Sequence, residues 1–165
     1  ALLLRAMAAP HIQQQGIKLL VAGEFYEDEK PYKNLIEQLK IENSVILKTQ
    51  FVPDSEVRYF LCACDFVIQP YREATQSGVT PLAYYFEKPM LVTNVGGLPA
   101  MVPNKKAGLV AEPSWESIAE KIGELYQLGE NYFIPFLREE KKKYSWEALT
   151  ETIFLLSSEN NSPIF

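Results

Sequence analysis

Cysteine, histidine and basic charge are scarce in this 165-residue chain, and each shortage excludes a class of protein. The two cysteines, Cys62 and Cys64, are separated by one residue, and the single histidine is His11, so the sequence offers neither a disulfide framework nor a metal cage. A net charge of −5 argues against the basic groove of a nucleic-acid-binding protein. We therefore expect no metal, no cofactor and no nucleic-acid partner.

Long hydrophobic runs are also missing. The opening stretch ALLLRAMAA is interrupted by Arg5 and lacks the charged start of a signal peptide. No other stretch approaches the roughly 20 apolar residues of a membrane span. The one basic run, at residues 141–143, is typical of a solvated helix end. We expect a cytoplasmic protein without a transmembrane segment.

What the chain does contain is a series of short apolar runs that alternate with helical patterns. Strands are expected at residues 17–22, 45–47, 66–68, 90–92 and 108–110, with helices between them, two more over 130–156, and helix caps at Asp54 and Ser114. Unbroken apolar strands of this length are typical of parallel sheets with helices on both faces. The sequence predicts an α/β protein with a Rossmann-like parallel sheet over residues 1–157. Because the first pattern opens in mid-helix, we expect the first strand of the sheet to lie upstream of Ala1, and a frayed tail at 158–165.

Proline fixes the start of the helix that follows the third strand. Pro81 has no N–H and fits only within about the first helical turn, so this helix is expected to begin at Ser77 or Gly78. The amides of Gly78, Val79 and Thr80 would then face outward beside the positive end of the helix dipole, which suits a diphosphate. A Ser-Gly pair at a helix start is more often a simple cap.

Four loops are expected on one rim of the predicted sheet, because the carboxyl ends of parallel strands lie at the same edge. They follow Ala22, Leu47, Ile68 and Val92. In such sheets ligands bind in the crevice outside these ends, where the strand order reverses. The rim strengthens the interpretation of the Ser77–Gly78 loop as an anion site.

Three segments carry a resemblance to a known family. AGE at 22–24, ACDFVIQPYRE at 63–73 and KPMLVTNVGGLPAMV at 88–102 resemble the C-terminal, donor-binding domain of retaining GT-B glycosyltransferases, in the family called glycosyl transferases group 1. The resemblance implies one half of a GT-B fold that binds a nucleoside-diphosphate sugar, with the acceptor bound by an N-terminal half that is not in this sequence. It implies transfer to a glycan, lipid or small-molecule acceptor by the longer parent, without metal or cofactor, and an inactive isolated chain. The resemblance leaves open whether the longer parent docks at the inner face of a membrane.

The resemblance also assigns binding residues, and no catalytic ones. Those for the donor diphosphate and sugar are Glu73, Thr75, Gln76, Ser77, Gly78 and Val79; Val52 and Gly23 lie on the side of the base, and Gly96 and Gly97 form a cleft loop. Ala74 and Leu82 stand where the family has paired glutamates. Leu82 cannot hydrogen-bond a ribose hydroxyl, so Gln76 or Thr80 would have to replace that contact.

Two other functions stay open on the sequence alone. The loss of both glutamates would fit a non-catalytic Rossmann-like module used in assembly or regulation. A sugar-nucleotide epimerase of similar architecture would need acid and base residues that the sequence does not offer. The remaining conspicuous side chains are expected to be structural: core packing for Cys64 and for Tyr84, Tyr85 and Phe86, helix anchoring for Trp115 and Trp146, a cap or turn for Asp65, and a surface position for His11.

Overall fold

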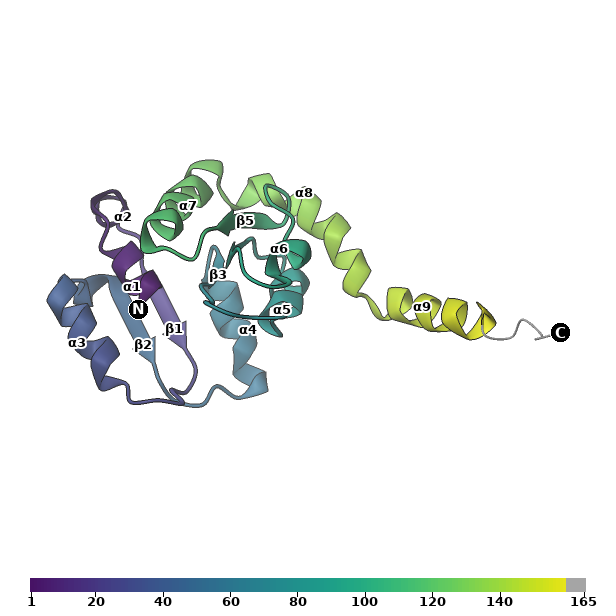
Figure 1. Cartoon of the computed structure of the whole chain (residues 1–165), viewed down its shortest axis with the longest axis horizontal. Coiled ribbons are helices and arrows are strands. Elements are labelled where there is room, and N and C mark those ends of the chain that lie inside the picture. The colour runs from purple at the N-terminus through teal and green to yellow at the C-terminus, as the bar shows by residue number, and fades with distance from the viewer. Residues whose placement is uncertain (160–165) are drawn as a thin grey trace.

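The structure, a computed structural model, describes residues 1–159 and contains parallel strands flanked by helices, as the apolar runs predict (Figure 1). Each of the expected strands is found close to its predicted place. They are β1 (Leu19–Ala22), β2 (Val45–Lys48), β3 (Val67–Gln69), β4 (Met90–Thr93) and β5 (Gly108–Ala111). All pairings between them are parallel.

The helices include two short ones at places where no helix was predicted, one before β1 and one in the loop between β4 and β5. The α-helices are α1 (Leu2–Met7), α2 (Pro10–Gln14), α3 (Lys30–Leu39), α4 (Asp54–Ala63), α5 (Val79–Tyr85), α6 (Leu98–Met101), α7 (Trp115–Leu128), α8 (Glu130–Glu140) and α9 (Trp146–Glu159), and 3-10 turns are η1 (Glu42–Ser44) and η2 (Lys141–Tyr144). Helices α2 and α6 have five and four residues, too few for a helical period to appear. Each has a proline in its first turn, where a missing N–H costs nothing.

The strands form two separate sheets rather than the single sheet that was expected. Strand β1 pairs with β2, and β4 lies between β3 and β5. Within residues 1–159 no pairing joins β1 to β3. Figure 1 shows β1 and β2 beside α3 on one side of the molecule, and β3 and β5 on the other.

The core is built around β4 and α7. All four residues of β4 are buried, and α7 packs against β4, β5 and α1. Because α1 also contacts α3, it links the two sheets on one face of the molecule. A Cβ on Gly108 would lie 1.8 Å from the carbonyl oxygen of Met90, so β5 can approach β4 this closely only with glycine at that position.

One of the two predicted helix caps is confirmed. Ser114 is the N-cap of α7, and its hydroxyl oxygen accepts a hydrogen bond from the Ser117 amide at 3.2 Å. The prediction for Asp54 is wrong, because Pro53 occupies the N-cap position of α4 and makes Asp54 the first helical residue. Cys64 is only half-buried, since α4 ends at Ala63 and Cys64 leaves the helical face that packs on the core.

The expectations for the aromatic residues are confirmed in part. Tyr84 is 1% exposed and donates to the carbonyl oxygen of Met101 at 2.7 Å, but Tyr85 is 73% exposed because the body covers α5 on one side only. Trp146 does not anchor its helix, since it is 80% exposed at the start of α9, which extends away from the body (Figure 1). Trp115 is partly exposed.

The remaining predictions concern His11, Asp65 and the C-terminal tail. His11 is exposed, as expected, and its Nε2 lies 3.1 Å from the carbonyl oxygen of Ala119. Asp65 is exposed and accepts a hydrogen bond from the Tyr126 hydroxyl at 3.4 Å rather than capping a helix. Helix α9 continues through Glu159, so residues 158 and 159 of the predicted tail are helical, and residues 160–165 lie outside the described residues.

Candidate functional site

The loop between β3 and α5 enters its helix as Pro81 requires, with Gly78 as the N-cap and Val79 as the first helical residue. Two of the three amides expected to face an anion are already engaged. The Val79 amide donates to the Ser77 hydroxyl oxygen at 3.2 Å, and the Thr80 amide donates to the Ser77 carbonyl oxygen at 3.2 Å. Of these three amides, only that of Gly78 makes no hydrogen bond within the described part of the chain.

A buried polar network holds this loop from below. Thr80 is completely buried and donates to Oε1 of the equally buried Gln69 at 3.2 Å. The hydroxyl of buried Thr93 donates to the carbonyl oxygen of Tyr71 at 2.6 Å, and the Tyr71 hydroxyl lies 3.2 Å from that of Ser77. Both ends of the loop are thereby fixed to β3 and β4.

The sequence analysis did not predict a role for Tyr71 or Thr93 in this network. One feature of the sequence could have indicated this network: Thr93 stands at the end of the apolar run that forms β4. A threonine in a completely buried strand needs a hydrogen-bond partner for its hydroxyl group. The carbonyl groups of the loop that follows the neighbouring strand β3 were the acceptors that such a position could have suggested.

The glycine pair Gly96–Gly97 braces the same loop from the side. The Gly97 amide donates to the carbonyl oxygen of Thr75 at 3.1 Å. A Cβ would lie 2.4 Å from that oxygen if built on Gly97, and 1.7 Å from the carbonyl oxygen of Ala74 if built on Gly96. Gly96 also has φ +51, where only glycine is unstrained. Close packing therefore explains this pair.

The side chains that the loop presents outward are polar. Glu73, Thr75 and Gln76 are exposed, whereas Ser77 is 8% exposed and Val79 is 38% exposed. These groups can donate and accept hydrogen bonds to a ligand. The loop therefore combines a fixed backbone with exposed polar side chains.

Ala1, which directly precedes α1, lies within electrostatic reach of Arg72 in this loop. Leu82 in α5 is 42% exposed, which leaves an apolar side chain where the resemblance has a glutamate.

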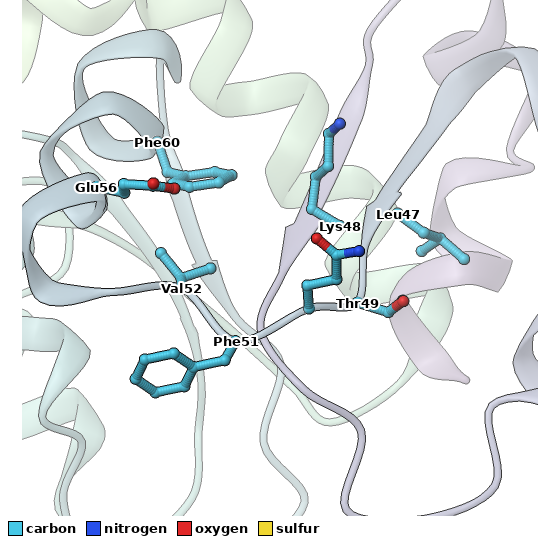
Figure 2. Close-up of a pocket in the computed structure, with 8 residues that line it drawn as sticks. Leu47, Lys48, Thr49, Phe51, Val52, Glu56 and Phe60 are labelled. Atoms are coloured by element: carbon cyan, nitrogen blue, oxygen red, sulfur yellow. The ribbon is translucent and has the colours of Figure 1, made fainter.

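A pocket of 410 Å³ opens between the end of β2 and the start of α4 (Figure 2). Lys48 rises from one wall, and Glu56 and Phe60 project from α4 on the other. Val52, predicted to lie on the side of the base, is among the residues that line it. The lining consists of Leu47, Lys48, Thr49, Gln50, Phe51, Val52, Glu56 and Phe60.

The structure does not bring all predicted site residues together. Gly23 is not in the lining of the pocket; its amide donates to the carbonyl oxygen of Lys48 at 3.0 Å and continues the pairing of β1 with β2. Residues 73–79 and the glycine pair form one unit, and Val52 belongs to the separate pocket. Among residues 1–159 no group of three or more His, Cys, Asp or Glu side chains is placed to hold a metal ion.

Comparison with known proteins gives a family and a fold. The family model described as glycosyl transferases group 1 matches residues 1–148. An uncharacterised glycosyltransferase of Methanocaldococcus jannaschii is 30% identical over 140 residues, which cover 80% of this chain and 37% of the relative. The structure of HepE from Anabaena in complex with UDP has a TM-score of 0.80 at 18% identity, covering 96% of this chain and 44% of HepE.

A structure of an isolated domain is also similar. The C-terminal domain of a glycosyl transferase group 1 family protein from Francisella tularensis has a TM-score of 0.71 at 16% identity, covering 86% of this chain and 74% of that domain structure. Likenesses at this identity show the fold, which is that of one half of a GT-B protein. The chain spans less than half the length of the M. jannaschii relative and of HepE. No helix in the described part of the chain has both the length and the apolar composition for a membrane span.

Proposed function

This chain belongs to the glycosyl transferases group 1 family, and from that premise we propose that it is the donor-binding half of a retaining glycosyltransferase. The donor is a nucleoside-diphosphate sugar, and the longer parent transfers the sugar to a glycan, lipid or small-molecule acceptor. Anabaena HepE has been crystallised with UDP and with UDP-glucose, which supports a donor of this class. The acceptor binds to the other half of the parent, so the isolated chain is inactive.

The observation that carries this proposal is the braced loop of residues 73–79. Gln69 and Thr80 hold it from below, and Gly97 holds it from the side. This leaves Thr75, Gln76 and the Gly78 amide facing outward at the carboxyl end of the strands. A backbone fixed before the ligand arrives binds the donor diphosphate without an ordering cost.

The nucleoside is proposed to occupy the pocket beside Val52. Its volume of 410 Å³ falls within the range of roughly 300–1,000 Å³ that is usual for small-molecule sites. Lys48 and Glu56 can hydrogen-bond a base edge or a ribose hydroxyl from its two walls. The exposed Glu73 is proposed to bind the sugar. The exposed Gln76 is proposed to make the ribose contact that Leu82 cannot make, because Thr80 is completely buried.

The reaction needs neither metal nor cofactor in this proposal. As the bond between the sugar and the diphosphate breaks, negative charge grows on the leaving phosphate. Hydrogen bonds from the Gly78 amide and from the polar side chains of the loop stabilise that charge, and the dipole of α5 adds to it. The acceptor attacks the sugar on the face from which the diphosphate leaves, so the anomeric configuration is retained.

A titration tests the proposal. The chain is titrated with UDP, GDP and ADP while its amide NMR shifts are recorded, and Gly78→Val and Gly78→Ala serve as graded variants. A Cβ at Gly78 meets no atom within 4 Å, so Gly78→Ala keeps the fold. The spectrum of Gly78→Val without nucleotide shows whether this variant keeps the fold too. We expect shifts centred on Thr75 to Val79 for one nucleotide, reduced in Gly78→Ala and abolished in Gly78→Val.

The exposed Leu82 favours a second candidate, a non-catalytic Rossmann-like module used in assembly or regulation. The nucleotide titration distinguishes the two candidates. Silence from all three nucleotides at millimolar concentration, in a folded chain that includes its upstream residues, would contradict donor binding and support the module.

A further inference from the structure

The pocket between β2 and α4 carries one charged group of each sign on its walls. Lys48 is the last residue of β2, and Glu56 lies in the first turn of α4. Figure 2 shows the two side chains on opposite sides of the pocket. Both are exposed, and within residues 1–159 neither side chain forms an ion pair or a hydrogen bond. The pocket therefore offers an ammonium donor and a carboxylate acceptor that no described protein group uses.

An aromatic ring lies beside the carboxylate. Phe60 follows Glu56 by four residues, so the two side chains share one face of α4. Phe60 is half-buried, and its ring projects from α4 toward Lys48 (Figure 2). The other ring of the lining, that of Phe51, is 68% exposed and turns away from Lys48. Phe60 is therefore the ring on which a flat ligand in this pocket can stack.

We propose that this pocket selects guanine, so that the donor is a GDP-sugar. This inference rests on the proposed function, because it names the base of the proposed donor. The base stacks on Phe60, and the Glu56 carboxylate accepts hydrogen bonds from N1–H and from the N2 amino group. From the opposite wall, the Lys48 ammonium donates to O6 or N7. Stacking on an aromatic ring holds any base, so the two charged groups make the choice.

The carboxylate distinguishes the bases because, when ionised, it can only accept hydrogen bonds. Guanine has two neighbouring donors on one edge, so both oxygens of Glu56 can be used at once. Uracil has a single donor, N3–H, between two carbonyl oxygens whose lone pairs would face the carboxylate. Adenine has one amino group, which is flanked by the acceptors N1 and N7. Glu56 therefore favours guanine over uracil and adenine.

The ammonium favours the same base. In guanine the acceptors O6 and N7 lie next to each other, so the Lys48 ammonium has two adjacent partners. In adenine the position of O6 is taken by the N6 amino group, which is a donor and would face the ammonium. HepE was crystallised with UDP, but a likeness at 18% identity shows the fold and not the base.

Calorimetric titration of the chain with GDP, inosine diphosphate, UDP and ADP tests this choice. Inosine diphosphate is GDP without the N2 amino group. We expect GDP to bind most tightly and inosine diphosphate to bind about tenfold more weakly, because one hydrogen bond to the charged Glu56 is lost. UDP and ADP should bind at least about tenfold more weakly than GDP, because they leave the charged groups of the pocket unpaired.

Three substitutions separate recognition of the base from general effects. Glu56→Gln should weaken GDP and bring it within about twofold of inosine diphosphate, since the amide has one acceptor oxygen in place of two. Phe60→Leu should weaken both nucleotides by about tenfold and keep their ratio. Glu37→Gln removes the same charge from an exposed residue of α3 outside the lining and should change neither affinity. The ratio of the two affinities within one variant does not depend on how much of it is folded.

The outcomes distinguish this inference from the proposed function. If UDP or ADP binds more tightly than GDP, the choice of guanine is wrong and donor binding stands. If the unchanged chain binds GDP and inosine diphosphate equally, or if Glu56→Gln keeps their ratio, Glu56 does not recognise the base and the inference is overturned. If none of the four nucleotides binds, even to the chain that includes its upstream residues, the proposed function fails and this inference fails with it.

Discussion

Placing an alanine at Gly96 tests whether the glycine pair holds the loop of residues 73–79. The new Cβ would lie 1.7 Å from the carbonyl oxygen of Ala74, so the backbone of the loop must move. A left-handed alanine costs about 1–2 kcal/mol, and overpacking costs about 1–3 kcal/mol. We expect Gly96→Ala to lower the free energy of unfolding by roughly 2–5 kcal/mol, the sum of these two ranges.

Two other glycines provide matched controls. Gly97 has ordinary backbone angles and a contact of 2.4 Å with the carbonyl oxygen of Thr75, so Gly97→Ala should cost only the overpacking part, about 1–3 kcal/mol. A Cβ on Gly78 meets open space, and Gly78→Ala at the N-cap should cost less than about 1 kcal/mol.

Thermal unfolding followed by circular dichroism measures the order of these three variants, at roughly 2–4 °C per kcal/mol for a domain of this size. NMR shifts show where the backbone moves, and we expect the largest changes within residues 73–78. A Gly96→Ala protein as stable as Gly78→Ala would refute the reasoning, because the loop would then not lie against the glycine pair.

Three further predictions concern hydrogen bonds and charge. Ser77→Ala removes the acceptor for the first amide of α5 and should cost about 1 kcal/mol in urea unfolding. Thr80→Val leaves the buried Oε1 of Gln69 without its donor and should cost about 1–3 kcal/mol, with part recovered when Gln69→Leu is added; full additivity would argue against the pair. Hydrogen bonds from Lys141 and a nearby arginine hold the pKa of the Glu87 carboxyl below its usual 4.5, so its contribution is present above pH 4.5 and is lost as the pH falls through the lowered value. Glu87→Gln should therefore flatten the acid side of the stability curve, and an unchanged curve would contradict this.

The strands were predictable because each is a short apolar run next to a helical pattern. Five strands and their parallel direction follow from that alternation. The division into two sheets does not, because pairing depends on which strands are neighbours in space.

The candidate site could be predicted only where a residue type fits few backbone positions. Pro81 located the start of α5, because a missing N–H restricts where proline can sit. The engagement of the Val79 amide could not be foreseen, since it depends on the rotamer of Ser77. The exposure of Trp146 also depends on tertiary structure, because nothing local tells a helix that packs from one that extends away.

Helix α9 has a consequence for how this protein is made. Synthesis runs from the N-terminus, so residues 1–144 can pack around β4 and α7 while α9 is still being added. When α9 follows, its first turn contacts η2, but Leu149, Ile153 and Phe154 stay exposed to water. Exposed apolar segments of this kind aggregate or are held by chaperones. The exposed apolar side chains of α9 are therefore the part of residues 1–159 that most needs a cover while the protein is being made.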